Sequence, residues 1–362
     1  MSDEVNLFAQ QEANRRRSRW LVIGFILFFA WLGFGGDYIA YLATAHAPPE
    51  SYHHVFPWIG LVLTTLGALM AKYSYSTGPT NILKSTGARE IIDAQTPQET
   101  QLVNVVEEMS VASGITKPHI WIVDDPDPNA FATGHDESDS NIAVTQGLLA
   151  ICSRDELQAV VAHEMGHIKN LDVRLMTLLA ALVGAVALIA DGAGRVMFSG
   201  GFGRGRSRSS SDRESGSNPL VILLFVVWIV SWILAPLITR LLAMGVSRKR
   251  EYLADAMSAQ FTRNPLALAS ALTKIESASE PTRSIKGGAA HLCIADPMGR
   301  AVNGAEGKVA ELFGTHPPMP TRIARLKLMG YEQSEQAIPG GSAAPIATPT
   351  TASIPAIQSH RR

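Results

Sequence analysis

His163-Glu164-Met165-Gly166-His167 (HEMGH) is the stretch of sequence that constrains the fold most strongly. On a helix, two histidines four residues apart project from one face, about one turn apart. Both imidazoles can therefore bind one zinc ion, and Glu164 can reach a water molecule at the metal. The pattern predicts metal-dependent hydrolysis in which Glu164 takes a proton from water and passes it to a leaving amine. The alternative is an accidental match on an ordinary helix.

The residues before this motif favour a helix. Ser153 and Glu156 have the spacing of a capping box, which marks a helix start. Apolar residues then recur at helical spacing, at Leu157, Val160 and Val161. We therefore expect HEMGH to lie on an amphipathic helix that begins near Ser153.

A catalytic zinc site needs a third protein ligand and an open position. No third histidine follows His167 at the usual spacing, because residues 170 and 173 are Asn and Val. Glu251–Asp255 (EYLAD) instead offers two carboxylates four residues apart on a second predicted helix. Glu251 could bind zinc, while Asp255 accepts a hydrogen bond from a ligand histidine and orients its ring. The alternative is a solvated charged patch with ordinary salt bridges.

Four apolar stretches interrupt the polar sequence: Trp20–Gly36, Val55–Ala71, Leu175–Ala190 and Pro219–Thr239. A helix needs about 20 apolar residues to cross a bilayer. The fourth stretch has that length and the first, which Asp37 is expected to end, nearly has it. The second and third could instead be re-entrant or packed against protein. The chain is 17% charged and 46% hydrophobic, which suits a protein partly dissolved in lipid.

The composition also argues against two other classes of protein. With 31 basic and 32 acidic residues the net charge is −1, so no nucleic-acid partner is expected. The two cysteines, Cys152 and Cys293, form neither a CxxC pair nor a disulfide framework, which fits a reducing compartment.

The sequence predicts an α+β fold in which membrane-embedded helical hairpins carry an HExxH catalytic domain. The expected parts are a cytoplasmic segment (1–19), two transmembrane helices (20–73), a first part of the metalloprotease domain (74–174), a transmembrane hairpin (175–243) with a Gly/Ser/Arg-rich loop (199–218), a second part of that domain (244–332) and a disordered tail (333–362).

Several separated motifs resemble those of the gluzincin-type membrane zinc metalloproteases. The likeness is to the bacterial heat-shock protease (HtpX) family, with the CAAX prenyl endopeptidases as more distant relatives. It rests on HEMGH and on four further motifs: SRKREYLAD (247–255), THPPMPTRIARL (315–326), NAFATG (129–134) and NIAVTQGLL (141–149). The motifs occur in the same order, and the resemblance covers roughly residues 21–329.

The resemblance implies a gluzincin-type domain with endopeptidase activity on protein or peptide substrates. It implies one Zn2+ per chain, held by His163, His167 and Glu251, with Glu164 as the general base. An extended substrate would dock beside Asn129, Ala130 and Phe131, on an edge strand where main-chain hydrogen bonds supply affinity.

The THPP segment is a further candidate. The tetrahedral intermediate of peptide hydrolysis carries an oxyanion that a positioned donor should stabilise. His316 or Arg322 could supply that donor, and the family pattern points to this segment. The alternative for both residues is a structural helix start. His291 and the His53–His54 pair lack partners at ligand spacing, so we expect them at a surface or interface.

Charge predicts the orientation in the membrane. Four arginines precede the first apolar stretch: Arg15, Arg16, Arg17 and Arg19. The loop 45–51 contains neither arginine nor lysine, so the N-terminus is expected in the cytoplasm. A two-helix hairpin returns the catalytic region to that side of a bacterial inner membrane. The arginines of loop 199–218 would then lie on the far side, which disagrees with this rule. His167 lies about 12 Å from Leu175 at the rise of a helix, so the site is expected near the bilayer surface.

Three functions are consistent with these features. The first is an endopeptidase that cleaves membrane proteins in quality control, a role that the resemblance supplies. The second is processing of specific peptides, although four apolar stretches are too few for the intramembrane chamber of the prenyl endopeptidases. The third is a non-catalytic zinc-binding scaffold, which would need the ligands but would not need Glu164.

Overall fold

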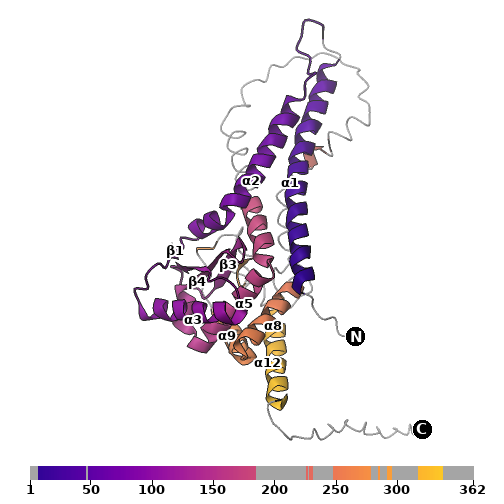
Figure 1. Ribbon diagram of the computed structural model, residues 1–362. Helices are drawn as coiled ribbons and strands as arrows, with labels where there is room; N and C mark the ends of the chain where they lie inside the picture. The colour runs from indigo at the N-terminus through magenta and orange to yellow at the C-terminus, as the bar shows by residue number, and fades with distance from the viewer. Residues whose placement is uncertain are drawn as a thin grey trace, which may run out of the picture.

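The computed structural model consists of a long helical hairpin joined to a body of helices and a small sheet (Figure 1). It describes residues 7–45, 48–184, 226, 228–230, 248–278, 284–285, 292–295 and 317–336. Most of the fourth apolar stretch, the loop 199–218 and most of the tail therefore lie outside the described residues. The mixture of helices with one small sheet agrees with the predicted α+β class.

The sheet has the strand order β1-β2-β4-β3. Its strands are β1 (Arg89–Glu90), β2 (His119–Val123), β3 (Ala130–Asp136) and β4 (Asp139–Thr145). β2 and β4 run parallel, whereas β1 and β3 pair antiparallel with their neighbours. β3 is thus an edge strand of this sheet, and one side of it pairs with no other strand of the sheet.

Helices surround the sheet and form the body of the molecule. They are α3 (Pro97–Ser113), α4 (Gln146–Ile151), α5 (Arg154–Lys169), α8 (Arg248–Thr262), α9 (Pro265–Ser277) and α12 (Met319–Gln336). The predicted capping box at Ser153 and Glu156 is confirmed at the start of α5. α5 lies within an apolar core. The side chains that α5 contributes to this core are fully buried: Leu157, Val160, Val161, Met165 and Ile168.

α5 and α8 approach closely at Gly166. A Cβ atom on this glycine would lie 3.2 Å from the Cα of Ala254 and 3.4 Å from the Cβ of Met257. The absent side chain lets the two helix backbones come together, which brings Glu251 near the histidines of α5.

The hairpin is formed by α1 (Leu7–Thr44) and α2 (Trp58–Ser85), which lie side by side (Figure 1). Glycines allow the contact: a Cβ on Gly33 would lie 2.7 Å from the Cα of Gly60, and one on Gly67 would meet Phe29. Small residues are typical of helix contacts in membranes. Among the described residues, one helix, Phe8–Leu42, is long and apolar enough to cross a membrane. Many large apolar residues of the hairpin are exposed, including Trp20, Leu27, Trp31, Trp58, Val62 and Leu69.

Asp37 ends the uncharged stretch Trp20–Gly36 but not the helix, which continues to Thr44. It lies within α1, where its carboxylate accepts hydrogen bonds from the main-chain N–H groups of Ile59 (3.1 Å) and Gly60 (2.6 Å). The first turn of α2 has N–H groups without partners in the helix, and a carboxylate from the neighbouring helix satisfies them.

Of the two places expected for His54, a surface or an interface, the structure excludes the surface. Its Nε2 lies 2.7 Å from Asp37 Oδ1, and the residue is 7% exposed rather than at a surface. Its neighbour His53 is half-buried. The Asp37 carboxylate provides the polar partner that makes the burial of an imidazole favourable.

The third apolar stretch is buried where it is described. Residues 172–184 are helical, and six of their apolar side chains are at most 5% exposed: Val173, Met176, Leu178, Leu179, Ala180 and Leu182. Gly78 of α2 contacts this helix at Ala181. Residues 175–184 thus pack against other parts of the protein, and the predicted membrane crossing of this stretch stays a prediction.

Replacing Gly166 should destabilise the body of the protein. In Gly166→Val the branched side chain forces α8 away from α5, and overpacking of this kind costs about 1–3 kcal/mol. The melting temperature of the metal-free protein in detergent should fall, whereas Gly24→Val, at a glycine with no atom within 4 Å of its Cβ position, provides the matched control. An unchanged melting temperature for Gly166→Val would show that the two helices can separate without cost.

Candidate active site

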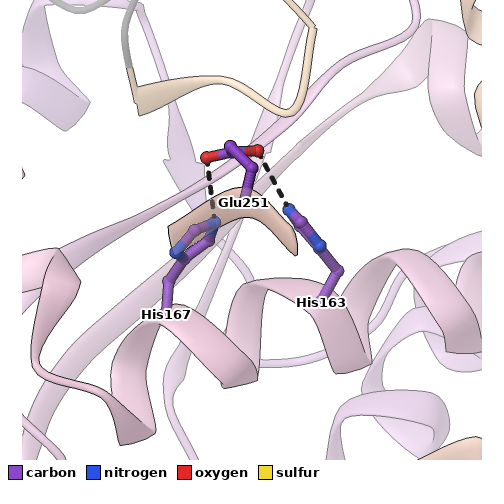
Figure 2. A group of neighbouring side chains, drawn as sticks. All are labelled: His163, His167 and Glu251. Atoms are coloured by element: carbon purple, nitrogen blue, oxygen red, sulfur yellow. Dashed lines mark ion pairs between the residues drawn. The ribbon is translucent and has the colours of Figure 1, made fainter. Parts of the chain in front are cut away.

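Three side chains that the sequence nominated as metal ligands converge between α5 and α8 (Figure 2). Glu251 Oε2 lies 3.7 Å from His163 Nε2, and Glu251 Oε1 lies 3.5 Å from His167 Nε2. One potential ligand atom from each residue lies within 4.8 Å of the others. All three residues are buried.

The spacing suits a tetrahedral zinc ion. Ligands about 2.0–2.2 Å from such an ion lie roughly 3.4 Å apart, close to the two distances between Glu251 and the histidines. Two imidazoles and one carboxylate are also a donor set that zinc accepts in catalytic sites. These residues can therefore hold the metal that the sequence implies.

Glu164 lies beside the two histidines on α5 and is 1% exposed. Neither of its carboxylate oxygens has a hydrogen-bond partner of normal geometry among the described residues. Burial raises the pKa of this carboxyl to about 7. A group with this pKa can accept and return a proton near neutral pH.

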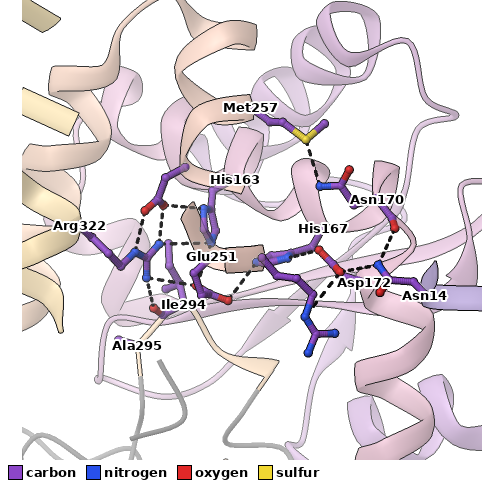
Figure 3. A network of polar contacts seen from close by, with 12 residues as sticks. Asn14, His163, His167, Asn170, Asp172, Glu251, Met257, Ile294, Ala295 and Arg322 are labelled. Carbon is purple, nitrogen blue, oxygen red and sulfur yellow. Dashed lines mark hydrogen bonds and ion pairs between the residues drawn. The ribbon is translucent and has the colours of Figure 1, made fainter. Parts of the chain in front are cut away.

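Asp255, which is itself bound by Arg322, contacts Nδ1 of His163. Asp255 Oδ1 lies 3.0 Å from His163 Nδ1, which leaves Nε2 to face Glu251. Arg322 donates to both Asp255 oxygens, from Nε at 2.9 Å and from Nη2 at 2.7 Å (Figure 3). Burial favours the neutral imidazole and lowers the pKa of His163. Asp255 occupies the orienting position that its spacing from Glu251 had suggested.

His167 is held in the same way by Asp172. Asp172 Oδ2 lies 3.3 Å from His167 Nδ1, and Asp172 Oδ1 accepts a 2.7 Å hydrogen bond from Asn14 on α1 (Figure 3). Burial opposes protonation of His167, but Asp172 and Glu251 outweigh it and raise the pKa to about 9. Arg250 Nε approaches Asp172 at 3.8 Å.

Sequence reasoning missed both Asp172 and Asn14. Asp172 follows His167 by five residues, outside the helical spacings of three and four. It reaches the imidazole because the chain turns at Leu171, whose φ of 57° ends α5 before the next helix begins. The available signal was an acidic residue directly after the motif helix; nothing in the sequence near residue 14 points to the site.

Arg322 lies beside the metal-facing nitrogen of His163, with its Nη2 3.4 Å from His163 Nε2. It is fully buried, and its Nη1 donates to the main-chain oxygen of Ile294 at 3.1 Å and lies 3.4 Å from Glu251 Oε2. Burial opposes its charge, but the neighbouring carboxylates, Asp255 foremost, raise the pKa of the guanidinium. His316, the other candidate oxyanion donor, and His291 lie outside the described residues.

The predicted substrate strand is covered by another segment of the chain. Asn129, Ala130 and Phe131 are at most 1% exposed, and the segment Leu292–Ala295 lies along them. Ile294 N donates to Ala130 O at 2.9 Å. Asn129 Nδ2 donates to Ala295 O at 3.0 Å. In this conformation the three residues are therefore not open to a substrate.

The charges around the site do not balance by themselves. Four buried carboxylates face two buried guanidinium groups: Glu164, Asp172, Glu251 and Asp255 against Arg250 and Arg322. A divalent cation would bring this sum to zero. Burial opposes protonation of His167, yet Asp172 and Glu251 raise its pKa, which reflects the same excess of negative charge.

Known proteins are similar to this chain over most of its length. Residues 96–329 match the model of Peptidase family M48. A Protease HtpX homolog of Dictyoglomus turgidum is 38% identical over 320 residues, covering 88% of this chain and 93% of the relative. One from Streptococcus gordonii is 34% identical (89% and 100% covered), and one from Tropheryma whipplei is 42% identical (75% and 85% covered).

A solved structure is similar at a lower level. The crystal structure of S. mikatae Ste24p aligns with 85% of this chain and 66% of its own, with a TM-score of 0.43 and 18% identity. That similarity is too low to argue from. The family match and the HtpX homologues are sufficient, and they confirm the resemblance seen in the motifs: the chain belongs to peptidase family M48.

Proposed function

We propose that this protein is a membrane-bound, zinc-dependent endopeptidase. The observation that carries the proposal is the convergence of His163, His167 and Glu251 around one point, with Glu164 beside it. The family supports protease activity, and the donor set and the charge balance support a divalent cation. A structural zinc site would not need a buried carboxylate such as Glu164 with no hydrogen-bond partner of normal geometry.

Zinc in such a site supplies Lewis-acid polarisation of the scissile carbonyl and makes water more acidic. Glu164 then accepts the proton of the attacking water on a carboxylate oxygen and delivers it to the leaving amine nitrogen. Its pKa of about 7 suits both steps. Asp255 and Asp172 keep the Nδ1 atoms of His163 and His167 engaged, so that both Nε2 atoms face Glu251.

The position of the α1–α2 hairpin supports the proposal that the active site lies close to the membrane. α1 carries the candidate span Phe8–Leu42, and its first turns contact the end of α5, where Gln11 Nε2 donates to Lys169 O at 2.6 Å. The arginine-rich start of α1 thus lies on the same side as the catalytic body. By the positive-inside rule we place both in the cytoplasm, beneath the inner membrane.

The proposed substrates are membrane proteins, and the proposed role is their quality control, as the likeness to bacterial heat-shock proteases implies. Processing of specific peptides remains the second candidate enzyme function. No described feature favours it over the first.

Glu164→Gln should abolish proteolysis while leaving the metal bound. General acid–base catalysis contributes about 10²–10⁴-fold, so cleavage of casein or of a membrane-protein substrate should fall by that range. Glu107→Gln, at an exposed glutamate of α3, is the matched control and should cleave normally. Normal proteolysis by Glu164→Gln with full zinc content would eliminate Glu164 as the base.

Glu251→Ala should lower the zinc content of the purified protein, because two imidazoles alone hold the ion weakly. Metal analysis of the detergent-solubilised variant tests this directly. Lys249→Ala, two residues earlier on the exposed face of α8, should retain zinc as in the wild type. Full occupancy in Glu251→Ala would remove this carboxylate from the ligand set.

A further inference from the structure

Asn14 is a buried amide that the proposed mechanism does not use. It is 1% exposed, although the next three residues of α1 are exposed arginines. Its Nδ2 donates two hydrogen bonds, to the main-chain oxygen of Asn170 at 3.0 Å and to Asp172 Oδ1 at 2.7 Å. Both acceptors lie directly after the motif helix α5, about 156 residues away in sequence.

The second of these bonds leads to the metal site. Asp172 uses its other oxygen, Oδ2, to face His167 Nδ1 at 3.3 Å. The orientation of the imidazole therefore depends on the carboxylate, and that of the carboxylate depends on Asn14. Arg250 Nε, at 3.8 Å from Asp172 Oδ1, is too far away to replace the hydrogen bond from Asn14.

A purely structural role for Asn14 is less economical. Gln11, one turn earlier on α1, already attaches the helix to α5 through the oxygen of Lys169. Fastening α1 to the body does not require a second amide, nor one directed at a carboxylate. Figure 3 shows Asn14, Asp172 and His167 following one another in a single line of contacts.

We propose that Asn14 is a positioning residue for the metal site: through Asp172 it fixes the ring of His167, so that zinc affinity depends on how α1 is seated. The inference rests on the proposed zinc ligation by His167. It extends the site to the N-terminal helix, outside the part of the chain that matches the family model.

Asn14→Asp is the sharpest test, because it keeps the shape and replaces the donor with a second carboxylate facing Asp172. Zinc affinity of the full-length protein in detergent is measured by competition with a chelator. Loss of a group that orients a metal ligand costs about 10–100-fold in affinity, and we expect the lower end of that range. Gln11→Ala is the matched control and should bind zinc normally. The Co2+-substituted Asn14→Asp protein should also show an altered visible spectrum.

A double-mutant cycle separates positioning from general destabilisation. Adding Asn14→Ala to Asp172→Asn should cause little further loss of zinc affinity, because the two residues act in series. Additive losses, or wild-type affinity and spectrum in Asn14→Asp, would overturn the inference. A wild-type protein that binds no zinc would instead overturn the proposed function.

A different observation concerns β3, the edge strand of the sheet, and the segment Leu292–Ala295 that lies along it. Phe131 of β3 and Cys293 form an isolated antiparallel bridge, and Ile294 N donates to Ala130 O. The side-chain amide of Asn129 and the guanidinium of Arg322 engage the main-chain oxygens of Ala295 and Ile294. These are contacts to main-chain atoms, so an extended peptide of almost any sequence could make them.

The same segment runs past the metal ligands. The Arg322 nitrogen that binds Ile294 O also lies 3.4 Å from Glu251 Oε2. We infer that Leu292–Ala295 occupies the position of the substrate strand, and that an extended peptide substrate must displace it. This inference also rests on the proposed function. The segment forms one β-bridge with β3, whereas β3 and β4 pair along most of their length.

A disulfide can hold the segment in place. Residues 131 and 293 face each other as a non-hydrogen-bonded pair, with an expected Cα separation of about 4.5 Å that permits a disulfide. Phe131→Cys, in a Cys152→Ser background, should lose about tenfold or more of its proteolysis on oxidation and recover it on reduction, because the blocked edge cannot pair with substrate. Adding Cys293→Ser should abolish this response.

A second variant covers the case in which Phe131→Cys folds poorly. Ile294→Pro removes the N–H that donates to Ala130 and should lower KM without changing kcat. Proteolysis that survives the disulfide, or a raised KM in Ile294→Pro with normal zinc content, would show that the segment is a fixed wall of the site. In either case the wild-type activity, and with it the proposed function, would stand.

Discussion

The structure depends on the meeting of one carboxylate, Glu251, with two imidazoles inside the protein. Burying charged groups is unfavourable unless each is paired and hydrogen-bonded. The chain meets this requirement with two similar arrangements, one behind each histidine. Asp255 and Arg322 support His163, and Asp172 and Asn14 support His167. The remaining negative charge is what a divalent cation would neutralise.

These contacts explain the wide separation of the contributing residues in sequence. α5 supplies both histidines, α8 supplies Glu251 and Asp255, and α12 and α1 supply the outer partners. Gly166 permits the approach of α5 and α8 on which the site is built. Because each outer partner comes from a different element, the packing of the whole body determines the orientation of the two rings.

Local signals made much of this predictable. The capping box at the start of α5 follows from short-range stereochemistry. The helical spacing of the histidines in HEMGH and of the carboxylates in EYLAD predicts a metal site. The roles of Asp172, Asn14 and His54 could not be read in this way, since each depends on a partner distant in sequence or on a turn outside the helix. The same holds for Asp37, which ends the uncharged stretch of α1 and also supports the start of α2.

The place of Asn14 on α1 has a practical consequence for work with parts of this protein. A fragment cut at the limits of the family match, residues 96–329, would keep HEMGH, Glu251, Asp255 and Arg322. It would lose Asn14 together with the hairpin, and Asp172 would then face solvent where the amide had been. Such a fragment keeps the three candidate metal ligands and Glu164 and still lacks part of the support for its second histidine, so the boundary of the family match is not the boundary of the contacts around the site.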